Sequence, residues 1–179
     1  ALANGGEWSE PRLTIGGKAP SLRKRVFSQE AAFLVADILC DRDARSVTFG
    51  LENPLATRFW AAVKTGTSKD MRDNWCIGYS GKYTVGVWAG NFSGDPMWNV
   101  SGITGAAPIW VEMMDFLHRN VSSIQREALS SLVRKKIEYS DSAVFGEEWF
   151  IRGTEPNFQS QRTGQLNPRI LYPPSGTVM

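Results

Sequence analysis

The chemistry that this sequence could perform is concentrated in one short run, Lys64-Thr65-Gly66-Thr67. The run closes a segment of strand-like composition. Side chains alternate along a strand, so the hydroxyl groups of Thr65 and Thr67 are expected on the same side. Two hydroxyls beside an ammonium group make a good receptor for a carboxylate. Gly66 has no side chain and would let another backbone come close. The run therefore predicts a site that binds a carboxylate.

The main chain of this run adds a second possibility. If the strand borders a cleft, an extended peptide could pair with its edge through main-chain hydrogen bonds. The amide N–H of Thr67 would then be free to donate to an oxyanion. The tripeptide Lys-Thr-Gly is a weak signal by itself, and the alternative is a strand that ends in a glycine turn with a surface lysine.

The other reactive side chains predict no second site. Cys40 and Cys76 lie 36 residues apart with no CxxC motif and no nearby pair of histidines, so we expect no metal site. Two buried thiols are favoured over a disulfide, which stays possible in an oxidising compartment. The sole histidine, His118, is expected to be a surface residue or a helix C-cap, and no Ser-His-Asp triad can be assembled around it.

Composition places the chain among globular proteins. Hydrophobic residues make up 42% of the 179 residues and charged residues 21%. A net charge of +2 gives no argument for nucleic acid or an anionic membrane as partner. No apolar run approaches the roughly 18 residues of a membrane span. The opening residues 1–6 read as the end of a helix with its glycine cap, so we expect a piece of a longer protein.

Hydrophobic spacing predicts the elements that must position the Lys64–Thr67 run. Ser28 is a good N-cap for a helix over Gln29–Cys40, with Glu30 in its first turn, and polar residues from Asp41 to Arg45 end it. Aromatic and β-branched residues then predict three strands joined as one antiparallel meander, with a tight turn at residues 80–82. The three strand-like segments are Arg58–Thr67, Trp75–Ser80 and Tyr83–Ala89.

Later segments give a helix and weaker signals. Pro108 suits a first helical position, and the row Ile109, Met113, Phe116 and Leu117 has the spacing of a helix face that packs on the meander. A short helix could follow at Ile124–Lys136. Strand-like residues recur at Trp149–Ile151 and Arg169–Tyr172.

Longer stretches make a family resemblance specific. Phe59–Asn91, Ala31–Arg45 and Gly102–Trp110 resemble the transpeptidase domain of class A penicillin-binding proteins, in which Lys-Thr-Gly is one of three shared motifs. Asp70–Trp75 and Glu147–Pro156 resemble the 1C type in particular. The resemblance implies an α+β fold class: a partial penicillin-binding/β-lactamase-like transpeptidase fold, with an antiparallel sheet of at least three strands and packed helices.

The resemblance also implies a domain division. Residues 1–120 would form the C-terminal half of a transpeptidase domain, residues 121–165 a linker or extension, and residues 166–179 the first strand of a truncated C-terminal β domain.

For function, the resemblance implies a peptidoglycan D,D-transpeptidase that cross-links stem peptides through an acyl-serine intermediate and binds penicillin. Lys64 would be the catalytic residue of this segment, holding the serine motifs in electrostatic register. Thr65, Gly66 and Thr67 would bind the substrate carboxylate. No metal and no cofactor is expected. The partners would be D-Ala-D-Ala stem peptides, β-lactams and the missing N-terminal half of the domain, with no nucleic acid.

Two serine motifs of that family are not found in this sequence. Its S-x-x-K match, Ser21 to Lys24, follows a proline in a basic connection and is interpreted as chance, and S-x-N does not occur. We therefore expect the chain alone to be inactive. The intact protein would be a bifunctional enzyme with a peptidoglycan glycosyltransferase, on the periplasmic face of the bacterial inner membrane, anchored through its absent N-terminal region. The alternatives are a D,D-carboxypeptidase or serine β-lactamase-like enzyme, and a non-catalytic β-lactam- or peptidoglycan-binding sensor.

Overall fold

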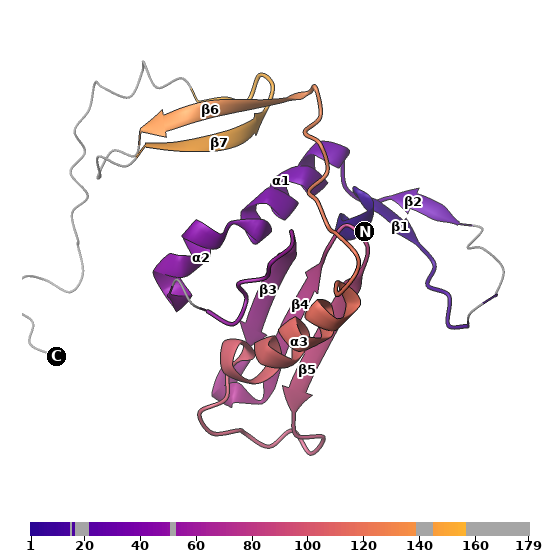
Figure 1. The fold of residues 1–179 in the computed structure, drawn as a ribbon, viewed down its shortest axis with the longest axis vertical. Helices are drawn as coiled ribbons and strands as arrows, with labels where there is room; N and C mark the ends of the chain where they lie inside the picture. The colour runs from indigo at the N-terminus through magenta and orange to yellow at the C-terminus, as the bar shows by residue number, and fades with distance from the viewer. Residues whose placement is uncertain (15, 17–21, 51–52, 139–144, 157–179) are drawn as a thin grey trace, which may run out of the picture. The chain divides into compact units, whose positions relative to one another are not determined.

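A computed structural model of the chain describes residues 1–14, 16, 22–50, 53–138 and 145–156 (Figure 1). The chain divides into two compact units, Ala1–Leu132 and Val133–Met179. Within the described residues, no helix is long and apolar enough to cross a membrane. The elements of the first unit are η1 (Leu2–Asn4), β1 (Glu7–Ser9), β2 (Arg23–Arg25), α1 (Gln29–Cys40), α2 (Arg42–Phe49), β3 (Ala62–Thr67), η2 (Lys69–Met71), β4 (Asp73–Tyr79), β5 (Thr84–Gly90), η3 (Gly102–Ala106) and α3 (Ala107–Leu117).

The centre of the first unit is the antiparallel sheet β3-β4-β5. The order is that of the predicted meander, and the turn after β4 closes with a hydrogen bond from the Ser80 amide to the Tyr83 carbonyl at 2.8 Å. Helices pack on this sheet, so the α+β class with an antiparallel sheet of three strands is confirmed. The first predicted strand was too long at its start, because only Ala62–Thr67 of it is paired.

Helix α3 covers one face of the sheet, as Figure 1 shows. Trp110 and Met114 of α3 are fully buried, as is Cys76 of β4. The Trp110 indole N–H also donates to the Val85 carbonyl of β5 at 3.1 Å. This bond satisfies the polar atom of a buried tryptophan and ties the helix to the sheet.

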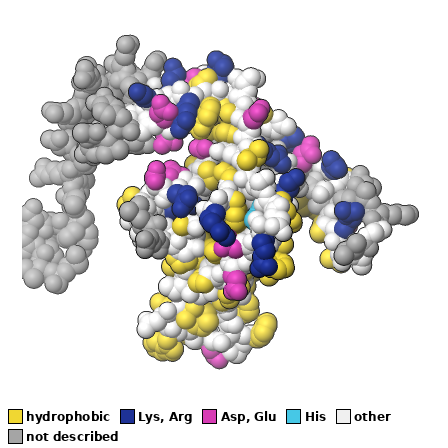
Figure 2. All heavy atoms as spheres, viewed as in Figure 1, with side chains coloured by type: hydrophobic (Ala, Val, Ile, Leu, Met, Phe, Trp, Pro, Cys, Tyr) yellow, Lys and Arg dark blue, Asp and Glu magenta, His cyan; other side chains and the backbone are white. Residues whose placement is uncertain are grey.

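The face of α3 that packs on the sheet differs from our prediction. Of the predicted row only Leu117 packs against the core, and it is half-buried. Ile109, Met113 and Phe116 are 52%, 47% and 60% exposed, whereas the row Ala107, Trp110 and Met114 is buried. Both rows have helical spacing, so periodicity could not choose between them. Trp110 buries the larger ring, and its row therefore faces the sheet. Figure 2 shows hydrophobic side chains on the face that carries α3.

Helix α1 covers part of the opposite face. Its Ala32 and Ala36 are buried, and Ala36 packs with Ala62 of β3 and Tyr79 of β4. The helix has the predicted bounds and cap, since the Ser28 hydroxyl accepts a hydrogen bond from the Ala31 amide at 3.0 Å.

Helix α2 was not predicted, because the polar residues that follow α1 were interpreted only as its end. Asp41 both ends α1 and caps α2: its Oδ1 atom accepts the amides of Asp43 and Ala44, each at 2.9 Å. Because one residue both ends α1 and begins α2, the sequence shows only one polar position there, and that position indicates the end of α1 without indicating the start of a second helix.

The second unit contains a two-stranded sheet of β6 (Leu132–Glu138) and β7 (Phe145–Ile151). The helix considered for Ile124–Lys136 is therefore wrong over its whole length, because residues 124–131 form no helix and β6 begins at Leu132. Arg134 joins the strands through an ion pair with Glu147 at 3.3 Å and a cation–π contact with Trp149. The predicted strand at Trp149–Ile151 lies in β7. Residues 166–179 lie outside the described part.

The corrected face of α3 can be tested with two adjacent methionines. Met114→Ala should lower the free energy of unfolding by about 2–5 kcal/mol, because it leaves a cavity in the core. Met113→Ala, at a half-exposed position, is the matched control and should change it by about 0.5 kcal/mol or less. Urea unfolding followed by circular dichroism measures both. Equal losses would contradict the assigned face.

Candidate functional site

The register of β3 on β4 fixes where each residue of the predicted site points. Thr65 is paired with Cys76 and Thr67 with Asn74, and both partners are buried beneath α3 and η3. Thr65 and Thr67 therefore lie on the face that carries α3. Lys64 and Gly66 lie on the opposite face, which is open at this end of the strand.

The outer edge of β3 has main-chain groups that no described strand pairs with. The Ser68 amide donates to the Asp73 carbonyl on β4 at 2.9 Å, and the inward and outward directions alternate along an antiparallel strand. The amides and carbonyls of Thr67 and Thr65 consequently point away from β4. Among the described strands none pairs with this edge, because β3 is the outer strand of its sheet.

The Lys64 ammonium group reaches that same edge. Its Nζ atom donates to the Thr65 carbonyl at 2.6 Å, although the Lys64 side chain leaves the strand on the opposite face from the two threonines. The run thus brings a cation, the main-chain groups of the edge and two hydroxyls to one border of the sheet. Lys64 is exposed, so its charge is available to a ligand.

The start of η3 holds Thr67 in place. The Gly102 amide donates to Thr67 Oγ1 at 2.9 Å, which leaves the Thr67 hydroxyl hydrogen free to donate to a ligand. Ser101 and Thr104 form a capping box that fixes this end of η3. Thr65 has no side-chain hydrogen bond within the described part of the chain.

Gly102, a residue that we did not predict, makes the close backbone approach at this site. A Cβ atom on Gly102 would lie 2.6 Å from the Gly66 carbonyl oxygen and 2.8 Å from that of Trp75. Gly66 is different, because a Cβ atom there would meet only Trp75 Cβ at 3.9 Å. The space beside Gly66 is therefore not needed by the fold and remains open to a ligand.

Side-chain hydrogen bonds stabilise the turn between β3 and β4. The Asp73 amide donates to Ser68 Oγ at 2.8 Å, and the Trp88 indole donates to Asp73 Oδ1 at 2.9 Å. Arg72 pairs with Asp70 at 3.8 Å rather than with Asp73. Asp70, like Met71, has a positive φ angle, an uncommon conformation for residues other than glycine.

His118 is the C-cap of α3, as one of our two predictions had it. Its Nε2 atom lies 2.8 Å from Ser80 Oγ, its Nδ1 atom lies 2.6 Å from the Val121 carbonyl, and its ring stacks on Phe59. Ser80 is buried and also accepts the amides of residues 82 and 83. The pair therefore fastens the β4-β5 turn to α3.

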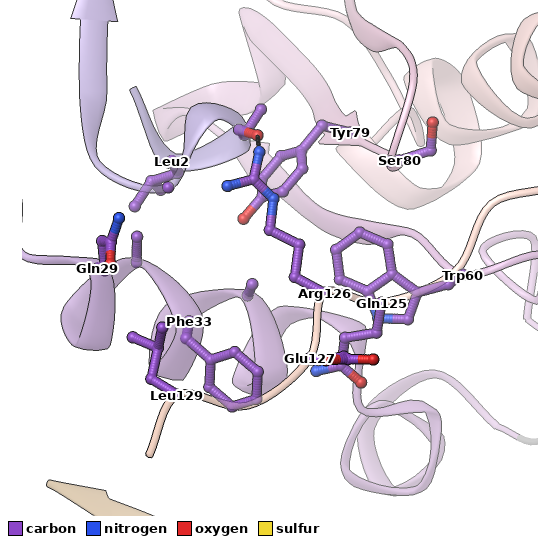
Figure 3. A pocket seen from close by; sticks show the side chains of 15 residues that line it. Leu2, Gln29, Phe33, Trp60, Tyr79, Ser80, Gln125, Arg126, Glu127 and Leu129 are labelled. Atoms are coloured by element: carbon purple, nitrogen blue, oxygen red, sulfur yellow. Dashed lines mark hydrogen bonds between the residues drawn. The ribbon is translucent and has the colours of Figure 1, made fainter. Parts of the chain in front are cut away.

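A separate cavity of about 130 Å³ lies between α1 and residues 125–129 (Figure 3). Arg126 lines the cavity and donates to the Ala3 carbonyl at 2.9 Å. Trp60 Nε1 and the Tyr79 hydroxyl line this region, and neither has a hydrogen-bond partner among the described residues. Burial raises the pKa of Tyr79. No residue of the Lys64–Thr67 run lines this cavity.

No model of a protein family matches the chain. Individual proteins do match. The chain is 32% identical over 149 residues to penicillin-binding protein 1A of Clostridium botulinum, which covers 74% of this chain and 17% of that protein. It is 31% identical over 106 residues to penicillin-binding protein 1C of Escherichia coli K12, covering 59% of this chain and 13% of that protein.

The fold has a solved counterpart. The crystal structure of penicillin-binding protein 1A from Haemophilus influenzae superposes with a TM-score of 0.62 at 23% identity, over 74% of this chain and 22% of that one. The sheet and its helices thus have the fold of part of a penicillin-binding protein. Together with the sequence relatives, this places the chain in the class A penicillin-binding protein family, with relatives of both the 1A and 1C types. The chain spans less than a fifth of the length of these two sequence relatives.

The contact between η3 and β3 gives a matched pair of variants. Gly102→Ala should lower the free energy of unfolding by about 1–3 kcal/mol, because its Cβ atom would press on two backbone carbonyls that cannot move aside. Gly66→Ala should fold nearly as well as the parent, since its Cβ atom meets open space. Thermal unfolding measures both. A Gly102→Ala variant as stable as Gly66→Ala would show that η3 does not clamp the site.

Proposed function

We propose that the outer edge of β3 is the carboxylate-binding side of the active site of a peptidoglycan D,D-transpeptidase. The observation that carries the proposal is the convergence of four kinds of group at this edge. These are the Lys64 ammonium, the outward main chain of Thr65 and Thr67, the two threonine hydroxyls, and the open space beside Gly66. Membership of the penicillin-binding protein family supports it.

Each group has a role in the proposed reaction. The terminal carboxylate of a D-Ala-D-Ala stem peptide accepts hydrogen bonds from the hydroxyls of Thr65 and Thr67. The Thr65 carbonyl pairs with the main chain of the extended substrate. The amide of Thr67 donates to the oxyanion that forms when the scissile carbonyl is attacked. Lys64 supplies positive charge beside the reacting groups.

The nucleophile belongs to another part of a longer protein in this proposal. A serine hydroxyl attacks the carbonyl carbon of the penultimate D-Ala, the terminal D-Ala leaves with a proton on its amine, and an acyl-serine ester remains. The amine of a neighbouring stem peptide then attacks that ester and releases the serine. A β-lactam enters the same site and forms the ester by opening its ring.

The isolated chain should form no covalent adduct with penicillin, because S-x-N does not occur in its sequence and its S-x-x-K match, Ser21 to Lys24, is interpreted as chance. The chain is incubated with fluorescent penicillin, and denaturing electrophoresis measures the fluorescence that stays attached to it. A complete class A penicillin-binding protein is the positive control. A stoichiometric adduct that hydroxylamine removes would overturn the assignment of the nucleophile to another region.

The role of Thr65 can be measured in the full-length protein that carries this segment. Thr65→Val keeps the shape of the side chain and should slow acylation by penicillin about ten- to hundredfold, since a hydrogen bond to a charged group is lost. Thr84→Val, at an exposed position of β5, is the control. Thr67 is less suitable, because its hydroxyl also holds Gly102. Equal acylation rates in both variants would count against the role.

A further inference from the structure

Three arginines meet at a pocket where α1, α2 and the segment before β3 come together. The pocket has a volume of about 220 Å³, and Arg42, Arg45 and Arg58 line it together with Cys40 and Trp60. It lies at the start of β3, whereas Thr67 ends that strand. Five residue steps of a strand span about 17 Å, so this pocket is distinct from the proposed transpeptidase site.

Among the described residues, no carboxylate accepts a hydrogen bond from these three guanidinium groups. Two of the groups donate to main-chain carbonyls, and the third has no hydrogen bond. Arg45 donates to the carbonyls of Leu39 and Cys40 at 3.1 and 3.3 Å, at the C-terminal end of α1. Arg42 makes one long bond of 3.4 Å to the Thr57 carbonyl. Within the described part of the chain, Arg58 has no hydrogen bond, and none of the three forms an ion pair.

Two of the nearby carboxylates are engaged elsewhere. Asp41 caps α2 through its Oδ1 atom, and the Asp37 carboxylate accepts a bond from Gln125 at 3.1 Å. Neither aspartate lines the pocket. Burial lowers the pKa of Arg45, and the charge of Arg42 lowers it further. The charge of Asp41 acts in the other direction and raises that pKa.

We propose that this arginine pocket binds a phosphate group, held between Arg42 and Arg58 with Arg45 as a fixed cation behind them. Guanidinium groups donate in a planar fork that fits the oxygens of a phosphate, and here they come from two segments, α2 and the residues before β3, so that they can contact different faces of a tetrahedral anion. Arg42 and Arg58 are exposed and have donors to spare, whereas Arg45 is positioned by the end of α1.

Calorimetric titration of the chain with inorganic phosphate tests the site. Arg42→Gln/Arg58→Gln should bind phosphate at least about tenfold more weakly, because two charge-assisted contacts are lost. Arg12→Gln/Arg23→Gln removes the same charge from exposed positions outside the pocket and should bind like the parent. No heat of binding in the parent at millimolar phosphate, or equal weakening in both double variants, would overturn the proposal. Acetate that binds as tightly as phosphate would overturn the choice of a phosphate.

Cys40 gives a local readout in the parent chain. Cys76 is fully buried and burial raises its pKa to about 12, so in the folded chain iodoacetamide should react at Cys40. Phosphate in the pocket should slow that reaction several-fold, because the anion covers the thiol and disfavours its thiolate. In urea, phosphate should have no effect on labelling. Unchanged labelling of folded Cys40 at saturating phosphate would contradict binding at this pocket.

Discussion

The pairing of β3 with β4 is the constraint on which the candidate site depends. A shift of one residue would move Thr65 and Thr67 to the opposite face and turn their amides towards β4. The observed register is held at one end by the bond between Ser68 and Asp73, and in the middle by Val63 and Cys76, which pack under α3. Burial of apolar side chains on one face thus decides which polar groups lie free at the edge.

The site combines a rigid support with an unpaired border. Gly102 and Thr67 join η3 to the strand from one face, and Asp73 joins the following turn to Trp88. These contacts leave the outward amides and carbonyls of the edge without a strand partner among the described residues. A free strand edge is an energetic liability in most proteins, because it invites pairing with other chains. Here the same free edge is what an extended peptide substrate needs.

Local signals in the sequence were sufficient for α1, for the meander and for the position of the Lys64–Thr67 run. Ser28 is a residue type that caps helices by accepting a hydrogen bond from an amide in the first turn. The tight turn before Tyr83 brings the two flanking strands side by side, so they pair. The supports of the site could not be predicted, because they join residues far apart in the chain. Nothing local shows that Gly102 lies on the Gly66 carbonyl, or that Trp88 bonds to Asp73. The buried face of α3 was also beyond reach, since two rows had the same period.

The central claim is that the outer edge of β3 receives the carboxylate end of the substrate. A crystal structure of the full-length protein that carries this segment, acylated by a penicillin, tests it most directly. The account predicts that the carboxylate of the bound ligand accepts hydrogen bonds from the hydroxyls of Thr65 and Thr67. It also predicts that the ligand's carbonyl oxygen accepts a hydrogen bond from the amide N–H of Thr67. A ligand whose carboxylate lies on other residues, with this edge unoccupied, would contradict it.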